Sequence, residues 1–256
     1  MQLPLLKASL GLLLGAFVVG VWWMAQGPDV ADAARRYYYQ QAFNEALPLQ
    51  ERYGPSKFSR NLEEWIVRDF FQDKRGGVFA DVGANHYQNE NNTYYLESKL
   101  AWSGVAVDAL AAFAADYQAH RPRTVFVAGF VSDVDGERVT FYVPQGNSLV
   151  ASASKEFTVR EGHPGEPTQI GTVTLNTILQ QAAIKEIDFL SMDIELAEPS
   201  ALRGFDIDRY RPRLVCIEAH PDVRQFILDY FHQAGYVVVG KYLRVDVSNL
   251  YFTPVS

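Results

Sequence analysis

The sequence predicts an α/β domain built on a mostly parallel β-sheet with an antiparallel edge, preceded by an N-terminal membrane helix. Short, continuous apolar runs recur between residues 77 and 217, and stretches with helical spacing separate them. This alternation is typical of a parallel sheet covered by helices on both faces. An uncharged apolar run from Ala8 to Pro28 predicts the membrane helix, because about 20 such residues cross a bilayer.

The N-terminal segment has a second interpretation. Trp22 and Trp23 stand near the end of the apolar run, where aromatic rings favour the headgroup region. A cleaved signal peptide is the alternative, since residues 31–33 offer small side chains of the right kind. We assign residues 1–28 to a transmembrane anchor or signal peptide, 29–59 to a linker, and 60–256 to the folded domain.

The composition excludes several classes of protein. The chain of 256 residues is 48% hydrophobic, which is typical of a globular protein and excludes a disordered one. Its net charge of −7 argues against a protein that binds nucleic acid by neutralising phosphates. Cys216 is the single cysteine, which excludes an internal disulfide and a thiolate zinc site.

The individual elements follow from the apolar pattern. Asn61 is predicted to cap the first helix of the folded domain, and Asp135-Gly136 predicts a hairpin turn. The predicted strands span residues 77–82, 104–107, 124–127, 138–143, 187–194, 214–217, 236–239 and 250–252, the last two at the edge. The predicted helices span residues 61–70, 93–100, 109–120, 174–183 and 223–234, and residues 144–168 form a long polar loop that could be a lid.

Polar side chains follow the first two predicted strands. Asp81, Gly83 and Asn85 come at the end of the first strand, and Asp108 ends the second. Ligands of open α/β sheets bind beyond the carboxyl ends of the strands, where an acid can bind both hydroxyls of a ribose. Without a Gly-x-Gly-x-x-Gly sequence, a nucleoside such as S-adenosylmethionine fits better than a dinucleotide, which disfavours a nicotinamide-dependent oxidoreductase.

Acidic side chains gather at the ends of the later strands. Asp193, Glu195 and Glu198 follow one strand, and Glu218 and His220 follow the next. An imidazole and several carboxylates at one rim could act as a general base on an acceptor hydroxyl. The same carboxylates could instead bind a divalent metal through oxygen.

Five segments in order carry a family resemblance: residues 78–85, 102–108, 174–179, 193–204 and 212–218. Their content and spacing resemble the FkbM family of S-adenosylmethionine-dependent methyltransferases over roughly residues 60–255. The resemblance implies a class I methyltransferase fold, with a Rossmann-like sheet, and O-methylation of a hydroxyl on a sugar or natural-product-like small molecule.

The resemblance also implies roles for individual residues. Asp81, Gly83 and Asn85 would contact the cofactor, and Asp108 would hold its ribose. The segment 130–133, with Ser132 and Asp133, would lie near the adenine. Asp193, Glu195 and Glu198 would face the reacting methyl group or support that wall, with His220 as a further catalytic candidate.

Two departures from the family pattern support an alternative function. Ser191 stands where the family usually has lysine, and Leu196 where it usually has glycine. Residues 92–104 are also similar to a membrane-anchored, Star-like subset of the family, which implies a non-catalytic role in binding or trafficking. With the predicted anchor, the chain is expected to be a single-pass membrane protein. Because S-adenosylmethionine is made in the cytosol, the domain of an active enzyme is expected to face the cytoplasm.

Overall fold

The structure is a computed structural model that describes residues 40–41, 44–144, 148–161 and 165–255. The chain divides into two units, residues 1–45 and residues 46–256. The described residues of the first unit are helical, and the second unit begins with a helix over residues 46–53. The predicted anchor at 1–28 lies outside the described residues, among which no helix is both long and apolar enough to cross a membrane.

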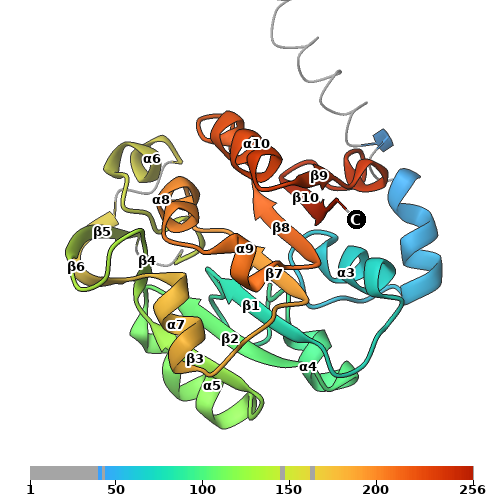
Figure 1. The fold of residues 1–256 in the computed structure, drawn as a ribbon, viewed down its shortest axis with the longest axis horizontal. Coiled ribbons are helices and arrows are strands. Elements are labelled where there is room, and N and C mark those ends of the chain that lie inside the picture. The colour runs from blue at the N-terminus through green and yellow to red at the C-terminus, as the bar shows by residue number, and fades with distance from the viewer. Residues whose placement is uncertain (1–39, 42–43, 145–147, 162–164, 256) are drawn as a thin grey trace, which may run out of the picture. The chain divides into compact units, whose positions relative to one another are not determined.

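A seven-stranded sheet, formed by described residues, is the centre of the second unit (Figure 1). Its spatial order is β3-β2-β1-β7-β8-β10-β9, and β10 runs antiparallel to both of its neighbours. The mostly parallel sheet is thus confirmed, but the antiparallel strand lies one place inside the edge, which β9 forms. The strands are β1 (Val78–Val82), β2 (Ser103–Asp108), β3 (Thr124–Ala128), β7 (Phe189–Met192), β8 (Leu214–Glu218), β9 (Tyr236–Val238) and β10 (Asn249–Pro254).

One face of the sheet is covered by four helices from the second half of the unit. They are α7 (Leu175–Gln181), α8 (Glu198–Arg203), α9 (Ile207–Tyr210) and α10 (Arg224–Gln233). Alternate strand residues such as Ala80, Leu190 and Val215 point into this layer and are fully buried. The period of two along each strand therefore builds a core on this face.

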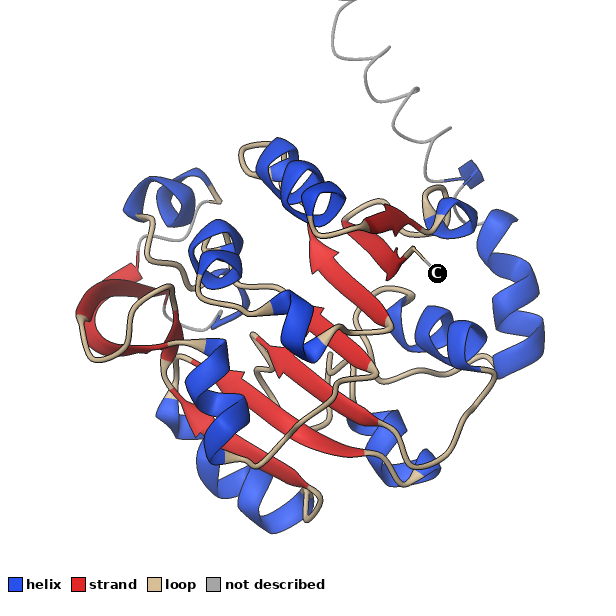
Figure 2. Ribbon diagram, viewed as in Figure 1, coloured by secondary structure: helices blue, strands red, loops and turns tan. Residues whose placement is uncertain are grey.

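The opposite face is covered mainly by helices from the first half of the unit, so the strands lie between two helical layers (Figure 2). Phe79, Phe189 and Cys216 occupy the alternate strand positions and pack against this layer. It contains the helix at 46–53, α3 (Glu63–Phe71), α4 (Tyr94–Leu100), α5 (Ala114–His120), which follows the 3₁₀ turn η1 (Ala111–Phe113), and the 3₁₀ turn η3 (Gly240–Tyr242). This double covering explains why the central strands are continuous apolar runs.

A small three-stranded sheet is inserted in the chain between β3 and β7. It consists of β4 (Phe130–Val131), β6 (Gly165–Val173) and β5 (Arg138–Pro144), in that spatial order. The 3₁₀ turn η2 (Ser148–Val150) and the helix α6 (Lys155–Arg160) connect β5 to β6.

Two predictions fail in this insertion. The polar stretch at 144–168 is not one long loop, because it contains η2, α6 and the start of β6. Asp135-Gly136 does form a turn, with Gly136 at φ +80°, but not a hairpin turn, since β4 and β5 are separated by β6. The hairpin instead joins β5 to β6, which a local turn signal could not indicate.

The start of α3 also differs from its prediction. Leu62 is the N-cap residue, and no side chain caps the helix. Asn61 instead donates from its side chain to Glu63, 3.2 Å away, and its backbone N–H donates to the same carboxylate. The Glu63 carboxylate thereby accepts a hydrogen bond from a backbone N–H that precedes the helix.

Candidate active site

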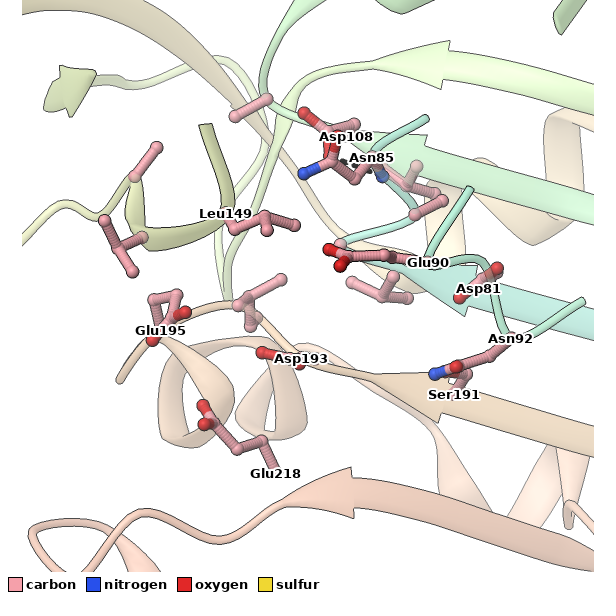
Figure 3. A pocket seen from close by; sticks show the side chains of 18 of the residues that line it. Asp81, Asn85, Glu90, Asn92, Asp108, Leu149, Ser191, Asp193, Glu195 and Glu218 are labelled. Carbon is pink, nitrogen blue, oxygen red and sulfur yellow. Dashed lines mark hydrogen bonds between the residues drawn. The ribbon is translucent and has the colours of Figure 1, made fainter. Parts of the chain in front are cut away.

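A cavity of about 440 Å³ lies at the carboxyl ends of the central parallel strands. Its wall includes residues 81–85 at the end of β1, 107–110 at the end of β2, Ser191 and 193–195 at the end of β7, and Glu218 and His220 at the end of β8. Figure 3 shows Asp108 and Asn85 at one end of the cavity and Asp193, Glu195 and Glu218 at the other. The strand-end side chains that the sequence singled out therefore meet around one space.

The turn after β1 depends on Gly83. Gly83 has φ +86°, and a Cβ atom there would lie 1.8 Å from the carbonyl oxygen of Asp193. Its N–H and that of Ala84 both donate to the carbonyl of Val107, at 2.9 and 3.0 Å. The space beside the Gly83 Cα atom is therefore occupied by the backbone that follows β7. Gly83 therefore holds three strand ends together beneath the cavity.

Asp108 ties the end of β2 to the turn after β1. Its Oδ2 accepts from the backbone N–H of Asn85 at 2.9 Å, and its Oδ1 accepts from that of Leu110 at 2.8 Å. Burial raises the pKa of this carboxyl, although the two hydrogen bonds lower it. A carboxylate has about four lone pairs, so each oxygen keeps an acceptor position for a ribose hydroxyl.

Asp81 supports the wall from inside the protein. It is 3% exposed, and Thr93 Oγ1 donates to it at 2.8 Å. Burial raises the pKa of Asp81 to about 6, while the Thr93 hydrogen bond and the charge of Arg121 lower it. Arg121 is itself buried, donates to Thr93 Oγ1 at 3.1 Å and forms an ion pair with Glu97. The segment around Thr93 therefore connects Asp81 to a buried positive charge.

The other end of the cavity is strongly acidic. Asp193 faces the cavity, Glu198 is fully buried behind its wall, and Glu218 is half-buried. One carboxylate oxygen from each of the three lies within 4.8 Å of the other two. Glu198 Oε1 accepts from the backbone N–H of Ile194 at 2.9 Å, which fixes this side chain at the start of α8.

The surroundings raise the pKa of each of these acids. Burial is the main cause in every case, and neighbouring carboxylates add to it. The pKa rises to about 7 for Glu198 and Glu218, to about 10 for Glu195, and well above its usual range for Asp193. Glu195 is therefore protonated at neutral pH and can donate a hydrogen bond.

His220 reaches the cavity but is engaged by protein groups at both ring nitrogens. Its Nδ1 accepts from the backbone N–H of Asp222 at 3.2 Å, and its Nε2 lies 3.2 Å from Nη2 of Arg160. Its ring also contacts Phe157 edge to face. His220 thus links the end of β8 to α6, and α6 would have to shift before the imidazole could act as a base.

Ser132 and Asp133, like the buried Glu198, are predicted site residues that do not line the cavity. The hydroxyl of Ser132 and a carboxylate oxygen of Asp133 lie 3.1 and 3.0 Å from Ser200 Oγ, and Asp133 forms an ion pair with Arg203. Both residues thus turn toward α8. From this segment, residues 129–131 line the cavity instead.

The chain matches the family profile described as the methyltransferase FkbM domain over residues 81–238. The chain belongs to the FkbM methyltransferase family. Membership implies S-adenosylmethionine as the methyl donor, and the cavity fits such a group, since its volume is within the range of small-molecule sites. The acid at the end of β2 also stands where a ribose is bound in open α/β sheets.

The comparison with solved structures found matches of low identity and low TM-score. A precorrin-6y C5,15-methyltransferase from Geobacter metallireducens is 8% identical, with a TM-score of 0.41, over 77% of this chain and 90% of that one. A TehB-like SAM-dependent methyltransferase from Corynebacterium glutamicum is 14% identical, with a TM-score of 0.42, over 88% of this chain and all of that one. No curated protein matches the chain.

The two departures of this FkbM domain have visible consequences. Ser191 accepts from the side-chain amide of Asn92 at 3.0 Å, so a hydroxyl occupies the family's lysine position beside Asp81. Leu196 has φ +77°, a left-handed conformation that favours glycine. The left-handed backbone conformation, which accounts for the family's usual glycine, is therefore retained here although the residue is leucine.

Several residues of the wall of the FkbM domain were not identified from the sequence. They come from segments outside the strand ends: Arg60, Glu63, Glu90, Phe141, residues 149–151, Phe157, Glu161 and Asn249. The segment before α3, the insertion and the start of β10 supply most of them. No local pattern distinguishes them, because long-range packing alone brings them to the cavity.

Proposed function

We propose that this FkbM domain is an S-adenosylmethionine-dependent O-methyltransferase that acts on a hydroxyl of a sugar or natural-product-like small molecule. The observation that carries the proposal is that one cavity has Asp108 at one end and Asp193 at the other. The donor would bind over the turn after β1, and the acceptor would bind against the acidic end. One continuous space allows the two reactants to meet.

The charge of the cavity supports an acceptor without anionic groups. Eight carboxyl side chains of described residues line it: Glu63, Asp81, Glu90, Asp108, Glu161, Asp193, Glu195 and Glu218. Among the described wall residues, Arg60 is the one arginine, and lysine is absent. Glu195 is neutral, but the carboxylates that are ionised would repel a phosphorylated or carboxylated acceptor. They would repel nucleic acid in the same way. A neutral polyhydroxylated molecule meets hydrogen-bonding groups instead.

The residues of the chain would mainly align the reactants. S-adenosylmethionine supplies a methyl group that its sulfonium makes electrophilic. A new bond forms between the acceptor oxygen and the methyl carbon while the carbon–sulfur bond breaks. Glu195, protonated at neutral pH, would donate a hydrogen bond that orients the acceptor, and a carboxylate of the acidic end or His220 would take the hydroxyl proton.

Calorimetric titration of the detergent-solubilised full chain with S-adenosylhomocysteine tests the donor site. We expect one molecule bound per chain, and we expect Asp108→Ala to weaken binding by about 1.5–3 kcal/mol, because hydrogen bonds to a charged group are lost. Asp116→Asn, an exposed acid on α5, is the matched control and should bind normally. An absence of heat with the wild-type chain would contradict the proposal.

A non-catalytic, membrane-tethered protein that acts in binding or trafficking is the second candidate. It is favoured by Ser191, which leaves the wall of the cavity without the lysine that the family usually has there. Donor binding without methyl transfer to any hydroxylated extract would support this candidate. Transfer of a labelled methyl group to such an extract would exclude it.

A further inference from the structure

Three carboxylates from different elements converge at the acceptor end of the cavity. Asp193 follows β7, Glu198 begins α8, and Glu218 ends β8. Their nearest oxygens all lie within 4.8 Å of one another. In the described part of the chain, no lysine or arginine nitrogen lies within 4.0 Å of these groups. Like charges are therefore brought together without a direct ion pair, although the more distant charge of Arg60 lowers the pKa of Asp193 and Glu218.

Unpartnered oxygens in this triad are a second observation that points to a ligand. Glu198 is fully buried, and its Oε2 has no hydrogen-bond partner, while its Oε1 is taken by Ile194. Oε2 of Glu218 is likewise buried and without a partner. Buried charges in proteins are normally paired or coordinate a metal, so these oxygens have the character of free ligand atoms.

We propose that Asp193, Glu198 and Glu218 bind one hard divalent cation of the Mg²⁺, Mn²⁺ or Ca²⁺ class. Such ions take oxygen ligands at about 2.0–2.6 Å, so two ligands on opposite sides of one ion lie about 4–5 Å apart. The spacing of the triad fits this limit. Because Asp193 faces the cavity, an ion can enter from there and keep a coordination position open toward the cavity.

Cation binding does not depend on the proposed methyl transfer. With an ion in place, an acceptor hydroxyl that coordinates it would have a lowered pKa. The three acids would then act as ligands, and a base outside the triad would take the proton. The site would thus select an acceptor with an oxygen ligand for a hard cation.

Titration of the chelator-treated full chain with Mn²⁺ tests the site without any cofactor. At about pH 8, where acids with a pKa near 7 are ionised, calorimetry should detect one Mn²⁺ per chain. Glu218→Gln should weaken binding by about 100-fold or more, because it removes a direct ligand and loss of an outer residue alone costs roughly 10–100-fold. Glu198→Gln should have a similar effect.

The control is Glu161→Gln, which removes one carboxylate from the same cavity but from outside the triad. It should change Mn²⁺ affinity by only a small factor. The unfolding temperature of metal-free Glu218→Gln should be no lower than that of the metal-free wild type, since a repelling charge is lost. Mn²⁺ should raise the unfolding temperature of the wild type and of Glu161→Gln but not that of Glu218→Gln.

Three results would overturn the inference. They are no binding by the wild type at millimolar Mn²⁺, normal binding by folded Glu218→Gln and Glu198→Gln, and an equal loss in Glu161→Gln. The last result would indicate diffuse attraction rather than a site. Binding of S-adenosylhomocysteine is measured separately, so failure of the metal site and failure of the proposed function can be distinguished.

Discussion

At the scale of single residues, the buried carboxyl of Asp81 links the stability of the fold to pH. Its neighbours Thr93 and Arg121 only partly offset the cost of burying it. Gly83, two residues later, could be predicted from the sequence as a position that requires glycine. The atom that makes the glycine necessary, the carbonyl of Asp193, could not be predicted, because it is far away in the chain.

The pKa of Asp81 gives a prediction for unfolding as a function of pH. The folded chain keeps the proton up to about pH 6, whereas the unfolded chain loses it near the ordinary value of 3.8. Between these values the folded state binds more protons, so the free energy of unfolding falls as pH rises, by roughly 3 kcal/mol in total. Asp81→Asn should remove this contribution to the decrease in the free energy of unfolding with rising pH.

Urea denaturation of the solubilised full chain at several pH values, followed by tryptophan fluorescence, measures the effect. Asp116→Asn serves as the control and should keep the wild-type pH dependence. If Asp81→Asn shows the same fall as the wild type, the raised pKa of Asp81 is not linked to folding.

At the scale of elements, the strands of the main sheet and β5 were predicted well, and the rest of the insertion was predicted poorly. Strands such as β1 and β8 are continuous apolar runs because both of their faces are covered. By contrast, α6 has only six residues, and five residues of β6 are exposed. Neither segment therefore has an apolar pattern from which the element could be predicted. Packing against β5 and against other residues around the cavity stabilises these elements. The local sequence does not indicate such long-range contacts.

The connection from β7 to α8 carries backbone strain that can be measured. Leu196 has φ +77°, where alanine is disfavoured and glycine is not. Leu196→Gly should therefore be more stable than Leu196→Ala by about 1 kcal/mol, since both lose the same side-chain contacts. Chemical denaturation of the two variants gives the difference directly.

The same pair of substitutions at Leu243 is the control. This residue is 44% exposed and has φ −57°, so alanine should be the more stable variant there. Equal stabilities of the two variants at position 196 would show that the left-handed conformation carries no cost.

At the scale of the whole molecule, the sequence predicted that strand ends meet but not the strand order. The order places β7 beside β1 and β8 beside β7, so the acids at the ends of β7 and β8 share one cavity with the turn after β1. Residues from distant parts of the chain, Glu63 and Asn249, also reach the wall. Such placement depends on the topology of the complete sheet, which local patterns do not specify.

The predicted anchor leads to a test of topology for the full chain. We propose that the domain faces the cytoplasm, because S-adenosylmethionine is made there and the proposed enzyme needs it. A carboxyl-terminal reporter that is active only in the cytoplasm should be active, and one that is active only outside it should be silent. Deletion of residues 8–28 should release the protein from the membrane fraction.

The opposite reporter pattern would contradict the cytoplasmic orientation. It would also favour the non-catalytic candidate, because the methyl donor would be absent from that side of the membrane. Release of the undeleted chain by mild washing would argue against an anchor.

The pairing of Val131 with Val173 has a consequence for engineering and for evolution. These residues are neighbours in parallel register, so the insertion leaves and rejoins the chain at nearly the same point. Its hairpin and α6 could therefore be exchanged for a segment of different length without altering the register of the seven-stranded sheet. Because Phe141, Phe157 and Glu161 belong to this segment and line the cavity, such an exchange would change the choice of acceptor. The donor site could be inherited unchanged while acceptors diversify.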